Sequence, residues 1–249
     1  MCISAYASAN SFLVNLISAV CLIFYGNSNL KTYNLIFGLF AIYTSLMQVV
    51  DFGIWTDLGC KIGTNRIASL LGPILVFLQP IMIFVIAYCV LNKTKFNKNI
   101  NKNNTINIKH TIFKLFDISS NKLNLSKVIN LFYGIGLGLF LYTYYTNTHT
   151  DINCSKVIDG SIKWGWLGNK KLSYYNIVIM LYISILFINF ISINPTSTYI
   201  YFVILVYGIL LFISFTWKKT HLGEIYCYIS NAVPLLLLIG QKIFRKYLR

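Results

Sequence analysis

The sequence predicts an all-α membrane protein, a polytopic bundle of about seven transmembrane helices. Only 11% of the 249 residues are charged and 57% are hydrophobic, whereas about a quarter of the residues of a soluble domain are charged. The mean hydropathy is +0.66. Apolar runs recur along the whole chain at the length of about 20 residues that a helix needs to cross a bilayer. This composition excludes a soluble enzyme, a disordered tail and a disulfide-stapled secreted domain.

Seven segments are expected to be helical spans, because backbone inside lipid must satisfy its own hydrogen bonds. They lack the alternation of barrel strands, and together they form a single transmembrane domain, residues 1–249. The predicted spans are Ala9–Tyr25, Tyr33–Trp55, Ile67–Leu91, Val128–Tyr145, Tyr174–Ile193, Tyr199–Trp217 and Ile225–Gln241.

Three details shape these spans. The first run also fits a cleaved signal peptide, but no Lys or Arg precedes it, which favours a span. Pro80 is expected to kink the third span. The uncharged stretch 172–217 is 46 residues long and would reach about 69 Å as one helix, so it must fold back. The turn is expected at 194–198, where the sequence reads NPTST.

The distribution of positive charge predicts the orientation. With seven spans, eight Lys and Arg residues fall on the side of the N-terminus and thirteen on the other side. Because cytosolic loops are enriched in Lys and Arg, we expect the N-terminus to be non-cytosolic and the C-terminus to be cytosolic.

The longest loop, 92–126, is basic and rich in Asn and Lys, and it falls on the cytosolic side. One interpretation is an arm that binds anionic lipid headgroups or nucleic acid. The other is a solvated loop in a chain whose composition is biased to Asn, Lys, Ile and Tyr. The loop has no nucleic-acid fold signature, so the partners we expect are the bilayer and its anionic headgroups, with no specific nucleic acid.

Polar residues within spans are costly and mark functional sites by default. Most of those in this chain fall between the non-cytosolic surface and the middle of the membrane, which predicts a shared pocket open to that side. The alternative is that each amide only bonds a neighbouring helix. The pocket candidates are Asn15, Gln48, Asp51, Gln79, His221, Glu224 and Asn231.

Asp51 is the one acid deep within a predicted span, where a proton, a cationic ligand or a metal would each use its carboxylate. His221 and Glu224 are spaced to share one helix face, and Asp51 could join them. With three His in the chain, this falls short of the ligands that a zinc hydrolase normally commits. We therefore assign no metal, no cofactor and no catalytic residue.

Three cysteines, Cys2, Cys60 and Cys154, fall on the non-cytosolic side. If that side is oxidising, a disulfide between Cys60 and Cys154 would join two outer loops, with their Cα atoms within about 7 Å. The alternative is reduced thiols.

The opening MCISAYAS resembles the MC-x-S-A-x-A-S start of an uncharacterised multi-span membrane family found in bacteria and in large DNA viruses of eukaryotes. Further matches are MQVVDF at 47–52, Trp55, Cys60, Asn65 and QP at 79–80, with looser ones at Cys154, 163–166 and 223–227. The chain lacks the His that the bacterial branch often has near position 75. The compositional bias is similar to that of the viral branch. The resemblance implies the outer polar cluster as a shared feature and no catalytic residue.

Two classes of function are therefore expected. The first is a non-enzymatic integral membrane protein, viral by this resemblance, that senses, conducts or organises through its outer pocket, in a host or virion membrane. The second is an intramembrane lipid-processing enzyme that uses Asp51, His221 and Glu224 as acid, base or metal ligands.

Overall fold

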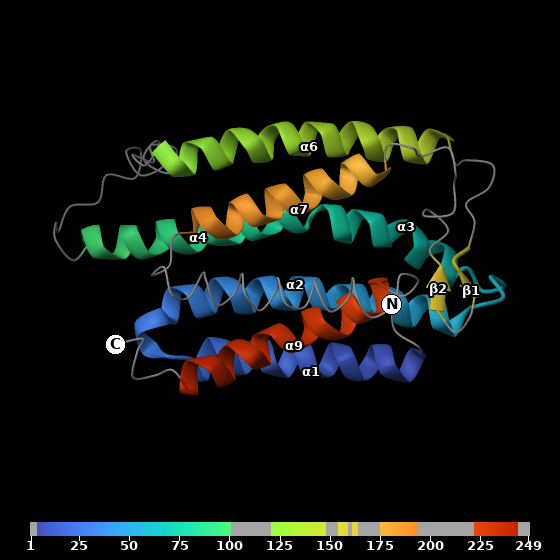
Figure 1. Ribbon diagram of the computed structural model, residues 1–249, viewed down its shortest axis with the longest axis horizontal. Coiled ribbons are helices and arrows are strands. Elements are labelled where there is room, and N and C mark those ends of the chain that lie inside the picture. Colours follow the sequence, from blue (N-terminus) through green and yellow to red (C-terminus); the bar gives the residue numbers. More distant parts are fainter. Residues whose placement is uncertain are drawn as a thin grey trace.

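Figure 1 shows the computed structural model of the chain, in which long helices lie side by side and a small strand pair closes one end. The structure describes residues 4–100, 121–147, 154–158, 161–163, 175–193 and 222–243. Its elements, in chain order, are α1 (Ala5–Tyr25), η1 (Ser28–Leu30), α2 (Lys31–Thr56), α3 (Thr64–Phe77), α4 (Gln79–Ile100), α6 (Asn121–Asn147), β1 (Lys156–Ile158), β2 (Ser161–Lys163), α7 (Tyr175–Ser192) and α9 (Leu222–Ile243).

Helices α1 and α2 form an antiparallel hairpin. Ser4 caps α1, its hydroxyl oxygen accepting the N–H of Ala7 at 3.1 Å, which satisfies one of the donors left over at a helix start. The two helices approach closely at Gly38, where an added Cβ would lie 2.4 Å from the Ile23 side chain. Small residues at such contacts let backbones approach within a membrane.

Helix α2 lies between two groups of helices (Figure 1). Helices α1 and α9 pack against it on one side. On the other side it packs against α3 and α4, and α7 and α6 pack against α4 in turn. The described core follows this division. One apolar cluster joins α1, α2, α4, α7 and α9, and a second joins α2, α3, α6 and α7.

Helices α3 and α4 are bent by 55° at a break around Leu78. Pro80 lies in the first turn of α4, where its missing N–H and fixed φ are tolerated, whereas inside a continuous helix it would remove a hydrogen bond. The expected kink is thus present, but the expectation of one helix over 67–91 is wrong, because the chain ends one helix at Phe77 and starts another at Gln79.

The last four carbonyls of a helix have no partner within it, and at this break all four in α3 accept hydrogen bonds. The N–H of Leu78 reaches the carbonyls of Ile74 and Val76. The carbonyl of Leu75 accepts from the Tyr43 hydroxyl of α2 at 3.0 Å. That of Phe77 accepts from the Tyr133 hydroxyl of α6 at 2.8 Å. The break is therefore supported by helices that are remote in sequence.

The helix ends gather in two groups (Figure 1). We call one end the hairpin end, after the antiparallel strands β1 and β2. It also holds the start of α1, the loop 57–63 and the starts of α7 and α9. The lysine end holds the turn 26–30, the end of α4, the start of α6 and the ends of α7 and α9. Helices α1 and α2 therefore run in opposite directions, and so do α2 and the bent α3–α4 pair.

Among the described residues, two helical segments are long and apolar enough to cross a membrane, Ala5–Tyr25 and Ser28–Thr56, and the bent α3–α4 pair makes a third if it is one span. Large apolar side chains face outward, such as Phe24 at 75% exposed and Phe132 at 69%. Surfaces of this kind do not suit water. The described helices thus indicate association with a membrane.

Helices lie where the sequence predicts six of the seven spans, and the remaining prediction, 199–217 with its turn at 194–198, lies outside the described residues. The loop predicted at 92–126 is wrong at both edges, since α4 continues to Ile100 and α6 begins at Asn121. Lysine is a good helix former, so a polar composition did not end the helix. The antiparallel pair of β1 and β2 was also not predicted.

Replacing Tyr133 with phenylalanine tests the support of the break. Tyr133→Phe leaves the Phe77 carbonyl without its donor inside the bundle and should lower the free energy of unfolding by about 1–2 kcal/mol. Tyr142→Phe, on the exposed side of the same helix, is the matched control and should change it little. Equal stability of both variants in detergent unfolding would show that the phenol does not support the break.

Candidate functional site

The interface between α1 and α2 carries a buried polar face. Asp51 is 0% exposed and Gln48 is 1% exposed, although both lie within a segment apolar enough to cross a membrane. Asn15 on α1 is also fully buried, and its side-chain amide donates to the Ala41 carbonyl of α2 at 3.1 Å. The other buried polar residues of these two helices are Ser8, Ser11, Ser18, Asn34 and Ser45.

The antiparallel register arranges these residues as a series along the bundle. Asn15 bonds Ala41, and α1 then runs toward the hairpin end as its numbers fall, so by this count Ser11 lies level with Ser45 and Ser8 lies level with Gln48. Gln48 and Asp51 are three residues apart and share one helix face, about 5 Å apart along the axis. Asn15, level with Ala41, lies about two turns nearer the lysine end than Gln48.

The backbone of α9 extends the same series. Gln241 bonds Asn34 of α2 at 2.7 Å. Glu224 and Asp51 are each 17 residues from that contact (241 − 224 and 51 − 34), which places their backbones at similar depth, about 25 Å away along each axis. By the same count Asn231 lies level with residue 44. The side chains of Glu224 and Asn231 are not described, and His221 lies outside the described residues.

Gln79 belongs to a different group of helices. Its side-chain oxygen accepts a hydrogen bond from the Tyr182 hydroxyl of α7. Asn15 lies on α1, on one side of α2, whereas Gln79 and its partner Tyr182 lie on α4 and α7, on the other side. The structure buries Asn15, Gln48 and Asp51 on the α1–α2 pair, and it places Gln79 at the break. A single pocket that unites all the candidates stays a prediction.

An amide pair that the sequence analysis missed lies just beyond the break. Asn189 of α7 and Asn130 of α6 donate to each other's side-chain oxygen, at 2.9 and 2.7 Å. Asn189 also donates to the Pro80 carbonyl at 2.7 Å and accepts from the Ser126 hydroxyl at 2.8 Å. Both donors and both acceptor positions of Asn189 are used. The signal was available, since this Asn is a polar residue within the mostly apolar, uncharged run 172–217.

A second missed cluster closes the lysine end. The side chain of Gln241 donates to Asn34 and accepts from the N–H of Asn27 at 2.8 Å. Asn34 donates in turn to the Asn27 carbonyl at 3.1 Å. An added Cβ at Gly26 would lie 2.3 Å from the Asn34 amide. Polar side chains here join helix ends rather than line a cavity.

At the hairpin end, Asp57 caps the loop before α3. Its carboxylate accepts from the N–H groups of Lys61 and Gly63 at 2.8 Å each, of Ile62 at 3.2 Å and of Asn65 at 3.4 Å. Burial alone would raise the pKa of this carboxyl, but these backbone donors outweigh it and hold the pKa below its ordinary value. The negative charge also faces the N-terminus of α3, where it is stabilising.

Asn65 then joins this loop to the segment before β1. Its amide donates to the carbonyls of Asp57 at 3.2 Å and Ser155 at 3.0 Å. Its side-chain oxygen accepts from the Ser69 hydroxyl and the Ser155 N–H, both at 3.0 Å. Beside it, Cys60 and Cys154 form a disulfide with Cα atoms 6.2 Å apart, which is the first of the two alternatives left open by the sequence. We call Asp57, Cys60, Asn65, Ser69, Cys154 and Ser155 the outer clasp.

The chemistry open to these groups is limited. Among the described residues no group of three His, Cys, Asp or Glu side chains is placed to hold a metal ion. The polar side chains of the outer clasp make their hydrogen bonds to one another and to the backbone of the adjoining loop. The α1–α2 face offers a carboxyl within a membrane-length helix, which can exchange a proton or bind a cation.

Comparison with protein-family profiles, with curated proteins and with solved structures finds no match to this chain. The resemblance to the membrane family of bacteria and large DNA viruses therefore stays an expectation from the quoted residues.

The lowered pKa of Asp57 predicts the acid sensitivity of the outer clasp. The ionised carboxyl stabilises the folded loop above the ordinary Asp pKa, and this stabilisation is lost as the pH falls toward the lowered value of the folded state. In detergent, the melting temperature of the wild type should therefore fall between pH 6 and pH 3 by more than that of Asp57→Asn. The variant should already melt lower at pH 6. Parallel pH profiles would contradict this role for the carboxylate.

Proposed function

We propose that the chain is a multi-pass integral membrane protein of seven spans, with the hairpin end non-cytosolic and the lysine end cytosolic. Among the described residues the lysine end carries seven Lys and no acid: Lys31, Lys93, Lys95, Lys98, Lys122, Lys127 and Lys242. The hairpin end carries four basic residues together with Asp57 and Glu224. This asymmetry favours a cytosolic lysine end.

Two further observations support this threading. Helix α7 ends at the lysine end and α9 begins at the hairpin end, the arrangement that the predicted span 199–217 would connect. The disulfide of Cys60 with Cys154 lies at the hairpin end, and disulfides persist in oxidising, non-cytosolic compartments.

The membrane in this proposal is that of a host cell or a virion. The support is the resemblance of residues 1–8 and 47–52 to the family named above, and the bias toward Asn, Lys, Ile and Tyr that is similar to its viral branch.

The proposed activity is non-enzymatic: Asp51 binds a proton or a small cation from the non-cytosolic side, and the protein senses, conducts or organises through this binding. The observation that carries it is a fully buried carboxyl in a membrane-length helix. Such a group costs roughly 2.5–3.5 kcal/mol at the centre of a span and marks function by default. Asp51 lies five residues before the end of α2, about 7.5 Å below it, within reach of the outer surface.

Substitution of Asp51 tests this activity. Wild-type protein, Asp51→Asn and the matched control Asp57→Asn would be compared in liposomes holding a pH-sensitive dye and in detergent with K⁺, Na⁺ or Ca²⁺. In liposomes, we expect the wild type to move protons across the membrane. In detergent, the alternative is that one of the cations raises its free energy of unfolding by about 2.7 kcal/mol at a concentration of a hundred times the Kd. Asp51→Asn should lose this response and Asp57→Asn should keep it.

Two outcomes would contradict the proposal. In the first, Asp51→Asn responds as the wild type does. In the second, the purified protein turns over phospholipid and Asp51→Asn abolishes the turnover, which would favour the enzyme with His221 and Glu224.

The proposed orientation predicts which cysteines can be alkylated and which glycosylation sequons stay unmodified. Alkylation of the unfolded, unreduced protein should modify Cys21 and Cys89, which are free thiols, and leave Cys60 and Cys154 unmodified. In a microsomal membrane, Asn92, Asn103 and Asn124, which begin N-x-S/T sequons, should carry no glycan because they face the cytosol. A glycan on any of them would reverse the orientation.

A further inference from the structure

The outward face of α1 carries a stripe of exposed side chains. Helix α1 lies at the edge of the bundle, with α2 and α9 packed against its other side (Figure 1). The exposed residues follow one another at steps of three and four, which is the spacing of the a and d positions of a heptad. The α1 stripe, as we call it, consists of Tyr6, Asn10, Leu13, Ile17, Val20 and Phe24. This is the pattern by which one helix packs along the length of another.

Asn10 places an amide within this otherwise apolar and aromatic stripe. Tyr6 and Tyr25, both 75% or more exposed, lie about 28.5 Å apart along the axis of α1. Tyr is enriched at the two surfaces of a bilayer, whose hydrocarbon core is about 30 Å thick. Asn10 then lies one turn, about 6 Å, inside the apolar layer, where lipid offers the amide no hydrogen bond.

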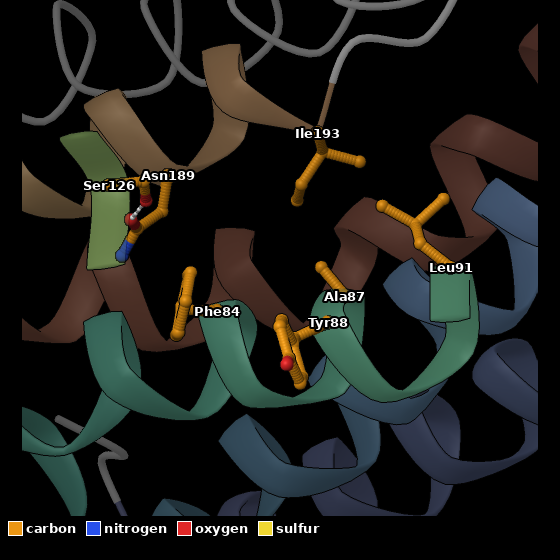
Figure 2. Close-up of a pocket in the computed structure, with 7 residues that line it drawn as sticks. All are labelled: Phe84, Ala87, Tyr88, Leu91, Ser126, Asn189 and Ile193. Atoms are coloured by element: carbon orange, nitrogen blue, oxygen red, sulfur yellow. Dashed lines mark hydrogen bonds between the residues drawn. The ribbon is translucent and has the colours of Figure 1, made fainter. Parts of the chain in front are cut away.

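Amides buried within the described helices have partners in the chain, and Asn10 does not follow them. Asn15, on the face of α1 that packs against α2, donates to the Ala41 carbonyl. Figure 2 shows a second case, in which Asn189 accepts the hydrogen bond of the Ser126 hydroxyl beside a cavity of about 10 Å³. The side chain of Asn10 is exposed and makes no hydrogen bond within the described part of the chain. The bundle therefore leaves this amide to a partner outside it.

We propose that the α1 stripe joins two copies of this chain in the membrane, with their Asn10 amides bonded to each other. The proposal rests on the proposed seating of the bundle in a membrane, and it holds for either orientation. A symmetric pair of copies that insert in the same direction has its two-fold axis along the membrane normal. Each residue of the stripe then faces its own copy at the same depth. An amide is both donor and acceptor, so Asn10 complements itself.

Charge and depth favour a second copy over a different partner. The first charged residue of the chain is Lys31, so the stripe is neutral and two copies approach without repulsion. A helix of another sequence would need its own polar group at the depth of Asn10, whereas a second copy supplies one by symmetry. A single Asn at an a position also sets the register of paired helices, and side-chain hydrogen bonds between helices promote association in membranes.

Disulfide cross-linking of single-cysteine variants tests the geometry. The full-length protein, with Cys2, Cys21, Cys89 and Cys227 replaced by alanine, would be oxidised in liposomes at low protein density. Ile17→Cys should give a covalent dimer, because the symmetric contact brings this position against its own copy. Ile135→Cys on α6 is the matched control, since Ile135 is 55% exposed and Ile17 is 61% exposed. It should remain monomeric.

Substitution of Asn10 tests the amide. Energy transfer between labelled copies, followed as the membrane is diluted with lipid, would give the Kd of the dimer. Asn10→Leu should raise this Kd about tenfold, within the range of hydrogen bonds between membrane helices, and Asn10→Gln, which keeps an amide, should raise it less. Thr143→Leu is the matched control, because it replaces an exposed polar side chain of α6, and it should leave the Kd unchanged.

Several results would overturn the dimer. They are equal cross-linking of Ile17→Cys and Ile135→Cys, cross-linking of neither, and association of Asn10→Leu that matches the wild type. None of these variants alters Asp51, so the dimer can fail while the proposed activity stands. Recovery of the chain in aqueous solution after carbonate extraction without detergent would instead overturn the membrane proposal itself.

Discussion

The break between α3 and α4 is the constraint on which the rest of the bundle depends. A helix end exposes carbonyls that water normally satisfies, and within a membrane no water is at hand. In α3 the backbone N–H of Leu78 satisfies two of the last four carbonyls, and side chains satisfy the other two. Tyr43 comes from α2 and Tyr133 from α6, and Asn189 of α7 bonds the Pro80 carbonyl on the other side of the break. These three helices must therefore lie at fixed positions around Leu78.

The same requirement explains where most of the buried polar side chains go. At the lysine end, Gln241 and Asn34 join α9 to the α1–α2 turn. At the hairpin end, Asn65 joins the loop after α2 to the segment before β1. In each case an amide bonds backbone that would otherwise lack a partner, which is the interhelical role of polar residues in membranes. Asp51 differs from them in kind, because its burial places an ionisable group in an apolar helix.

The sequence was sufficient for features that depend on local composition. The lengths of the apolar runs predicted the bounds of α1, α2, α7 and α9, and the end of α6, to within a few residues. They did not predict the lysine-rich turns at the end of α4 and the start of α6. Pro80 foretold a bend because proline acts on its own helix. The assignment of Cys2, Cys60 and Cys154 to one side made the Cys60–Cys154 disulfide one of two alternatives, and the structure contains it.

Partners that are distant in the sequence were beyond such reasoning. Nothing local shows that the hydroxyl of Tyr133 reaches Phe77, or that Asn130 pairs with Asn189, because these contacts depend on how helices rotate and pack. For the same reason the sequence grouped Gln79 with Asn15, whereas their hydrogen bonds lie on opposite sides of α2. Depth along a span can be counted from the sequence, but the face that a residue presents follows from packing.

The most direct test of the fixed break is the distance across it in a bilayer. Spin labels at Cys89 and at an Ile67→Cys substitution, with Cys2, Cys21 and Cys227 replaced by alanine, flank Leu78 at eleven residues on each side. With the 55° bend the Cα atoms should be about 29 Å apart, against about 33 Å for a straight helix. A single narrow distribution at the shorter distance in nanodiscs is the predicted result. A distribution at the longer distance, or two populations, would contradict a break held in place by the surrounding helices.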